Sequence, residues 1–77
     1  MTAQALARGQ RLREFRNARG WSQERLALAA GLSTMGVFQL EHGQREGRPA
    51  TWIALADALE VHPLHLLATP AVEDGPR

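Results

Sequence analysis

The sequence contains no cysteine and no tyrosine, and only 5% of its residues are aromatic. Without cysteine, a disulfide framework and thiolate chemistry are excluded. No apolar run is long enough to cross a membrane, and arginines interrupt residues 1–15, so neither a membrane span nor a signal peptide is predicted. Alternating runs of β-branched and aromatic residues, which indicate strands, are also missing. These absences favour a helical protein of the cytoplasm.

The residues that are present favour one small domain. Alanine, leucine, arginine, glutamine and glutamate, all good helix formers, dominate a chain of 77 residues that is 44% hydrophobic. We expect a domain over residues 1–69 and a flexible tail over residues 70–77. The net charge is only +1, yet six arginines fall between Arg8 and Arg25, which allows a locally basic face for an anionic polymer.

Capping residues divide the chain into five predicted helices. Ser22 and Ser33 are good N-caps, and Gly31 is a typical residue directly after a helix. Pro49 and Pro63 suit the first turns of the last two helices. The predicted helices cover Ala3–Ala18, Ser22–Ala30, Ser33–Glu41, Ala50–Leu59 and Pro63–Ala68, with a polar loop at Gln44–Arg48.

The second and third predicted helices form a helix-turn-helix, because a turn of about three to four residues separates them. Gly31 allows that turn without a Cβ clash, and Ala27 is small where the two helices must approach. The apolar residues that can face one core are Leu26, Ala30, Leu32, Val37 and Leu40. In this arrangement the first residues of the third helix are exposed, which suits the major groove of B-DNA.

Longer segments carry a resemblance to a known family. SQERLALAAGLS, at Ser22–Ser33, resembles the SQ-x-x-LA-x-x-AG-[LV]-S pattern of the phage-repressor and Cro-like helix-turn-helix family, also called XRE. VFQLEHG is similar to the family's ending of the third helix. GQRLREFRNARGWSQ and LADALEVHPLHLL resemble its first, fourth and fifth helices, so the resemblance covers Gly9–Leu67. It implies an all-α, five-helix, lambda-repressor-like DNA-binding domain.

The resemblance also implies roles for individual residues. Thr34, Met35 and Gln39 would face base edges, since Gln can bond adenine and Thr and Met can contact a thymine methyl. The residues implied in DNA backbone contacts are Gln23, Phe38, His42, Gln44, Arg45 and Arg48. For each polar residue, the alternative is an ordinary solvated side chain. Arg16 and Glu41 would form a structural ion pair that holds the first helix to the third.

The sequence departs from the family pattern at several positions. Gly36 stands where Ser or Tyr is commoner, and an interior glycine costs a helix about 1 kcal/mol relative to alanine. Phe38 replaces a polar residue, so half-burial and contact with a thymine methyl are alternatives to its backbone contact. Arg8 replaces an apolar residue, and the loop reads REGRPAT rather than NPSLET.

Apolar residues supply both the predicted core and a predicted dimer interface. The core candidates are Leu12, Phe15, Trp21, Leu26, Leu32, Val37, Leu40, Ile53, Leu55 and Leu59. One recognition helix reads only a few base pairs, so we expect a homodimer on a palindromic operator. The interface candidates are Trp52, Leu64, Leu66 and Leu67, with core packing as the alternative for Trp52.

These features predict a sequence-specific, DNA-binding transcriptional regulator, and we expect a repressor. Restriction–modification controller, antitoxin and phage regulator all stay open. The alternative class is a protein-interaction module that binds a toxin or another protein, which the apolar Met35 and Phe38 favour. We expect no enzyme, because Ser22, Ser33 and Asp57 form no nucleophile–base pattern. We expect no cofactor and no metal, because the candidate metal pair matches two surface histidines better than a site; that pair is His62 and His65.

Overall fold

The computed structural model describes residues 2–67, which form five α-helices. These are α1 (Ala3–Ala18), α2 (Gln23–Ala30), α3 (Thr34–Glu41), α4 (Pro49–Leu59) and α5 (Pro63–Leu67). Each predicted helix is present, and the all-α prediction is confirmed over this range. Residues 68 and 69 of the predicted domain and the predicted tail at 70–77 lie outside the described residues.

Short polar side chains set the boundaries of the helix-turn-helix. The Ser22 hydroxyl accepts a hydrogen bond from the backbone N–H of Arg25 at 3.0 Å. The Ser33 hydroxyl accepts one from the N–H of Gly36 at 2.9 Å. Between these caps, Gly31 has a φ of 73°, a left-handed conformation that residues with a Cβ atom rarely adopt. The chain can therefore end α2 and begin α3 within three residues, 31–33.

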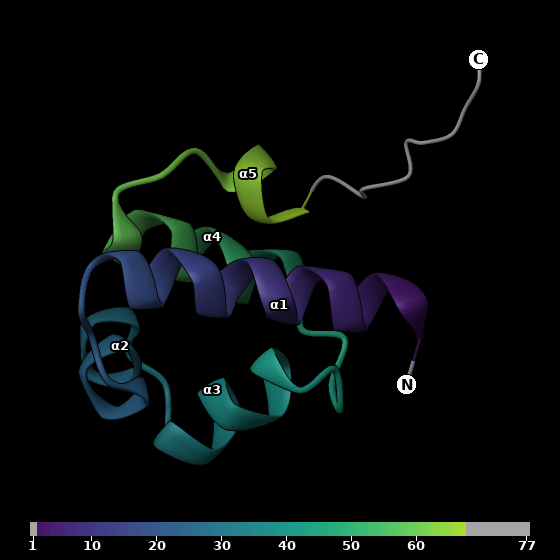
Figure 1. Cartoon of the computed structure of the whole chain (residues 1–77), viewed down its shortest axis with the longest axis horizontal. Helices are drawn as coiled ribbons and strands as arrows, with labels where there is room; N and C mark the ends of the chain where they lie inside the picture. Colours follow the sequence, from purple (N-terminus) through teal and green to yellow (C-terminus); the bar gives the residue numbers. More distant parts are fainter. Residues whose placement is uncertain (1, 68–77) are drawn as a thin grey trace.

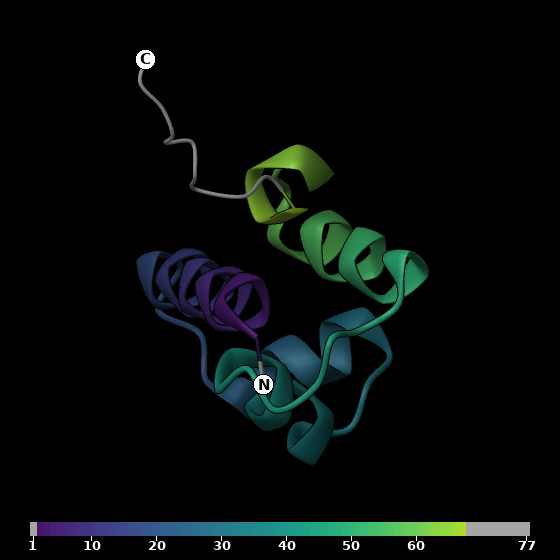
Figure 2. The same cartoon turned by 90° about the vertical axis from the view of Figure 1, so that its right-hand side faces the viewer.

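The five helices enclose a single core. α1 packs against α3 and α5, α2 packs against α3 and α4, and α4 packs against α5. In Figure 1, α1 crosses the middle of the view, with α4 and α5 above it and α2 and α3 below. The view turned by 90° shows the same separation, with α2 and α3 on one side and α4 and α5 on the other (Figure 2). The helix-turn-helix thus forms one side of the domain.

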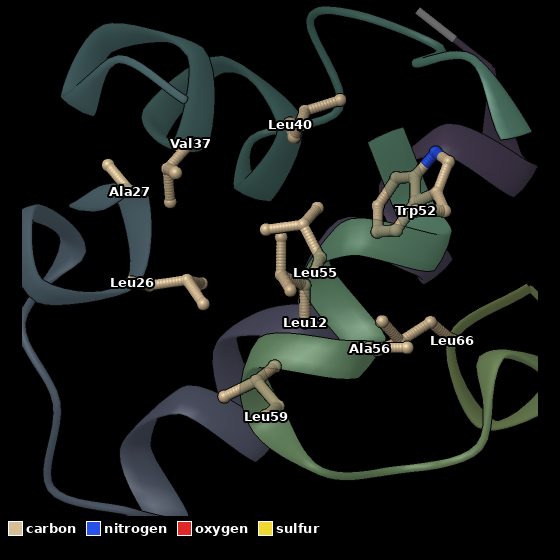
Figure 3. Packing of buried hydrophobic residues seen from close by; sticks show 10 residues of the cluster. All are labelled: Leu12, Leu26, Ala27, Val37, Leu40, Trp52, Leu55, Ala56, Leu59 and Leu66. Atoms are coloured by element: carbon tan, nitrogen blue, oxygen red, sulfur yellow. The ribbon is translucent and has the colours of Figure 1, made fainter. Parts of the chain in front are cut away.

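Side chains from all five helices meet inside this arrangement (Figure 3). The buried apolar cluster consists of Leu12, Leu26, Ala27, Val37, Leu40, Trp52, Leu55, Ala56, Leu59 and Leu66. Phe15, Trp21 and Leu32 are partly buried against it. The prediction that Ile53 belongs to the core is wrong, because this side chain is 51% exposed. α4 turns Trp52 inward at the neighbouring position, and this points Ile53 toward the outside.

Candidate nucleic-acid interface

α3 has one buried face and one exposed face. Its buried residues are Gly36, Val37, Leu40 and Glu41. On the other face Thr34 is exposed, Met35 is 62% exposed and Phe38 is 38% exposed, while Gln39 is half-buried. The residues expected at base edges therefore lie on the outer side of α3. Phe38 lies on this same outer side of α3, although the sequence analysis expected it to contact the DNA backbone and not a base edge.

The expected ion pair between Arg16 and Glu41 is present and joins α1 to the end of α3. Arg16 Nε donates to Glu41 Oε2 at 2.6 Å, and Nη2 donates to Oε1 at 3.0 Å. The Glu41 side chain is 0% exposed and that of Arg16 is 11% exposed. Two parallel hydrogen bonds between planar groups constrain orientation as well as distance. This pair therefore fixes the C-terminal end of α3 relative to α1.

Gln23, at the start of α2, belongs to the same polar cluster. Its amide Nε2 donates to Glu41 Oε1 at 2.9 Å. Arg16 Nη1 also donates to the backbone carbonyl of Trp21 at 2.7 Å. Glu41 consequently holds side chains from both preceding helices. The sequence assigned Gln23 to a DNA phosphate; the structure places its amide on Glu41, and the second hydrogen of that amide nitrogen can still serve another acceptor.

Gly9 allows α1 to approach the backbone of α3. A Cβ atom at this position would overlap the carbonyl oxygens of Leu40 and Glu41. Gly9 is buried, and α1 and α3 are in contact around it. Any larger residue here would push the two helices apart and disturb the placement of Glu41.

The loop between α3 and α4 is anchored by Trp52. The indole Nε1 donates to the backbone carbonyl of Glu46 at 2.9 Å, while the indole ring is buried in the core. Gly47 follows with a φ of 76° and lies against the Trp52 ring. The Thr2 hydroxyl donates to the Glu46 carboxylate at 3.1 Å. This loop therefore has a defined position beside α3.

A pocket of about 470 Å³ lies between this loop and α3. Its lining includes Ser33 and Gly36 from the start of α3, Arg45 and Arg48 from the loop, and Thr51 from α4. Arg45 and Arg48 are exposed, as is Gln44. Both arginines thus lie beside the start of α3, on the side of Ser33 and Gly36, with the carboxylate of Glu46 in the same lining.

His42 is the C-cap residue of α3, at one end of its exposed face. Its ring stacks on Phe38, with 4.0 Å between ring centroids and 24° between ring planes. The His42 Nδ1 atom lies 2.9 Å from the Phe38 carbonyl oxygen. Because a carbonyl oxygen only accepts, Nδ1 carries the hydrogen in this contact. The ring of Phe38 is therefore supported on one side by a fixed imidazole.

Comparison with known proteins identifies the family. The family model HTH_3, a helix-turn-helix, matches residues 12–66. The chain belongs to this helix-turn-helix family. A comparison with curated protein sequences gave no significant match.

Several solved structures share the fold of this helix-turn-helix protein. The restriction-modification controller protein C.AhdI from Aeromonas hydrophila is 43% identical, with a TM-score of 0.83 over 84% of this chain and 98% of that one. A hypothetical transcription factor, NHTF, from Neisseria is 30% identical, with a TM-score of 0.83 over 90% and 79%. The c2 repressor of P22, in complex with a synthetic operator, is 30% identical, with a TM-score of 0.75 over 79% and 92%.

Two of the predicted interface residues have no surface to offer to a second chain. Trp52 is 1% exposed and Leu66 is 0% exposed, since both fill the core of this helix-turn-helix domain. Their assignment to a dimer interface is therefore corrected to core packing. Leu64 is 62% exposed and Leu67 is half-buried, so both remain available, and Ile53 on α4 adds a further exposed apolar side chain.

His65 in α5 packs against Phe15, and His62 lies just before this helix. His65 stacks on Phe15 with 6.1 Å between ring centroids, and the rings of His62 and His65 are 6.3 Å apart. Within residues 2–67, no three His, Asp or Glu side chains are grouped so as to hold a metal ion. None of the described helices is long and apolar enough to cross a membrane.

Sequence reasoning missed the residues that position the site. Gly9 was not singled out, although an isolated glycine inside a helical pattern indicates close packing. The role of Trp52 as a hydrogen-bond donor to the loop had no sequence signal, because its apolar ring alone explains its position. The guanidinium groups of Arg19 and Arg25 both lie over the Trp21 ring, at 4.8 and 4.7 Å from its centroid. No signal in the sequence indicated these contacts.

Proposed function

We propose that the chain is a sequence-specific transcription regulator that binds DNA as a homodimer, with α3 in the major groove, and that it represses the genes it controls. The observation that carries the proposal is the two-sided environment of α3. Its inner face and C-terminal end are fixed by Val37, Leu40 and the Arg16–Glu41 pair, while its outer face is exposed. A helix held in this way can enter a groove without the domain having to rearrange.

Roles follow from position along this face. Thr34, Met35 and Gln39 contact base edges, and Gln39 is the residue able to bond adenine bidentately. Contacts with the phosphates come from Gln23, His42, Gln44, Arg45 and Arg48. The base contacts provide sequence preference, whereas the phosphate contacts provide affinity that weakens as salt rises.

One copy of α3 contacts only a few base pairs, and a dimer with two such helices recognises a longer and therefore more specific site. Two copies related by a two-fold axis would read half-sites about 34 Å apart, one turn of the duplex, so the operator is a palindrome. We propose that the dimer contact uses Leu64 and Leu67 of α5 together with Ile53 of α4. Exposed apolar side chains such as these are candidates for an interface between identical chains.

The similarity to C.AhdI supports a finer proposal. That protein is a restriction-modification controller, and this chain spans 98% of its length at 43% identity. We propose that this chain is likewise the controller of a restriction–modification system. The operator should then lie upstream of genes for a methyltransferase and an endonuclease. An operator found only beside unrelated genes would contradict this finer proposal.

The test is selection from a random duplex library, followed by anisotropy titration of the enriched duplex and of a scrambled control at several salt concentrations. We expect a palindromic winner, bound by two chains and far more tightly than the control. The second candidate function is an interaction module for a protein partner, which the exposed Met35 and Phe38 favour. No enriched sequence, together with weak binding even at low salt, would support that candidate instead.

A further inference from the structure

We propose that His62 is a pH-sensitive cap of α5, and that protonation of its ring loosens this helix and with it the contact between two copies of the chain. The cap itself depends only on contacts within one chain. The effect on assembly rests on the homodimer proposed above, whose contact includes Leu64 and Leu67 of α5.

His62 occupies the N-cap position of α5. Its backbone carbonyl accepts a hydrogen bond from the N–H of His65 at 2.8 Å, the first bond of the helix. Its ring atom Nδ1 accepts a second hydrogen bond, from the N–H of Leu64 at 3.1 Å. Pro63, the first residue of the helix, has no N–H to offer. The imidazole therefore satisfies a donor that has no partner within the helix.

An imidazole can act as this cap only while it is neutral. A backbone N–H donates, so Nδ1 must be free of hydrogen, and the single ring hydrogen is then on Nε2. A protonated imidazole carries hydrogen on both nitrogens and accepts none. Histidine is the side chain that ordinarily makes this change between about pH 5 and pH 8. Acidification in that range removes the acceptor and places a positive charge at the N-terminal end of α5, where the helix dipole disfavours it.

The other helices are not capped by groups that titrate in this range. The hydroxyls of Thr2, Ser22 and Ser33 cap α1, α2 and α3. The N-cap residue of α4 is Arg48, and its side chain forms no capping hydrogen bond. α5 is also the shortest of the five, with five residues, and has no acidic residue in its first turn. A change in pH thus acts selectively on α5.

Within residues 2–67, the His62 ring forms no ion pair with a carboxylate. Glu60, two residues earlier, pairs with Arg19 at 3.7 Å. The ring centroid of His65 is 6.3 Å away, and the His65 carbonyl accepts a hydrogen bond from Arg11 at 3.4 Å. The other charged side chains on the two helices that pack against α5 are Arg8, Arg13, Glu14, Arg16 and Asp57. Without an ion pair to favour the charged ring, protonation and the cap oppose each other.

α5 connects this cap to the proposed dimer contact. Leu66 is buried in the core and His65 stacks on Phe15 of α1, so the helix is packed on its inner side. Leu64, whose N–H the cap holds, is 62% exposed on the outer side. Loss of the cap therefore loosens a residue that the dimer contact uses, while Leu66 keeps the helix on the core.

Nuclear magnetic resonance tests the cap itself. The nitrogen shifts of the His62 ring and the amide shift of Leu64 are followed from about pH 8 to pH 5. We expect the neutral ring to carry its hydrogen on Nε2, and the Leu64 amide signal to move with the titration of His62. A neutral ring with its hydrogen on Nδ1, or a Leu64 amide that does not respond to that titration, would overturn the proposal.

Sedimentation equilibrium over the same pH range tests the effect on assembly. We expect the dimer dissociation constant to rise about fivefold as the ring is protonated, which corresponds to about 1 kcal/mol for a lost N-cap side chain. A dimer whose dissociation constant does not change with pH would refute the link between cap and assembly. If no dimer forms at any pH, the proposed homodimer fails and this link fails with it, while the resonance data alone decide whether His62 is the cap.

Variants assign the pH response to its residue. Asparagine is a good N-cap that does not titrate, so His62→Asn should keep the tight dimer at every pH. His62→Ala should dimerise about fivefold more weakly at every pH. His65→Gln is the matched control, because it removes the other histidine of this segment and leaves the cap, and it should keep the pH response. His42 is present in all three variants, so it does not contribute to the comparison.

Thermal unfolding of each variant verifies that the fold is intact. A pH response that persists in His62→Asn, or that disappears in His65→Gln alone, would place the titrating group elsewhere and contradict the assignment to His62.

Discussion

The two sides of this domain are held together by different kinds of contact. On the α2–α3 side, the buried carboxylate of Glu41 accepts hydrogen bonds from Arg16 on α1 and Gln23 on α2. On the α4–α5 side there is no buried carboxylate among the described residues: α1 donates hydrogen bonds only to the backbone carbonyls of Leu59 and His65, the buried side chains are hydrophobic, and Ile53 and Leu64 remain exposed. Hydrogen-bonded ion pairs specify direction, whereas apolar packing is non-directional. Directional contacts suit a helix that has to fit a DNA groove, and non-directional apolar contacts suit the side where we propose that the dimer forms.

Removal of Arg16 should have the largest effect on stability. Arg16→Met leaves the carboxylate of Glu41 buried without its cation, which costs about 3–5 kcal/mol of unfolding free energy. Urea unfolding measures the loss. The control is Glu60→Gln, which breaks a pair with Arg19 at 3.7 Å in which the Glu60 side chain is 76% exposed. Such an exposed pair contributes about 0–1 kcal/mol, so similar losses for both variants would contradict the proposed difference.

A methyl group at Gly9 should have the next largest effect. In Gly9→Ala the added Cβ overlaps two carbonyl oxygens of α3, so the helices must separate. Overpacking of this kind costs about 1–3 kcal/mol, and operator affinity should fall as well because α3 is displaced. The neighbouring, exposed Gln10→Ala is the matched control and should change stability by less than about 0.5 kcal/mol. A Gly9→Ala variant as stable as this control would show that α1 does not fix α3.

Loss of the indole hydrogen bond should loosen the loop at a smaller cost. Trp52→Phe keeps an aromatic ring in the core but removes the donor to the Glu46 carbonyl, and because Glu46 is exposed and its carbonyl can bind water instead, the lost hydrogen bond costs about 1 kcal/mol. Amide hydrogen exchange over Gln44–Arg48 should accelerate. Trp21→Phe removes the other indole and should leave exchange in this loop unchanged. Unaltered exchange in Trp52→Phe would mean that the loop is held by other contacts.

A charge on the α4–α5 side should change assembly and hardly affect the fold. Leu64→Asp introduces a carboxylate at a site that is 62% exposed, so the unfolding free energy of the chain itself should change by less than about 0.5 kcal/mol. Sedimentation should show that the proposed dimer, present for the unmodified chain, no longer forms. Leu28→Asp, at an exposed position on α2, should remain dimeric. If Leu64→Asp also remains dimeric, the dimer contact lies elsewhere.

Local signals in the sequence predicted the helices and the exposure of the first residues of α3. Ser22, Gly31 and Ser33 act through hydrogen bonds and backbone conformations within a few residues, so the boundaries of α2 and α3 agree with the expectation. The pairing of Arg16 with Glu41 came from the family resemblance, because no local pattern connects residues so far apart.

Contacts between distant segments account for what was missed. Gly9 matters because of the carbonyl groups of α3 that approach it, and a glycine gives no indication of which backbone does so. The Trp52 side chain has an apolar ring and a hydrogen-bond donor, so its position in the sequence could not decide between core packing and a dimer interface. The error at Ile53 was avoidable, because the helical period that places Trp52 and Leu55 inside turns Ile53 outward.

The claim that α3 reads bases while the loop holds phosphates is tested most directly by comparing two variants on two duplexes. Gln39→Ala and Arg48→Ala are titrated against the selected operator and a scrambled duplex over a range of salt concentrations. We expect Gln39→Ala to lose about 1–3 kcal/mol of affinity for the operator and little for the scrambled duplex. Arg48→Ala should weaken both alike and reduce the salt slope by about 1. Equal losses for both variants on both duplexes would contradict the division of roles between α3 and the loop.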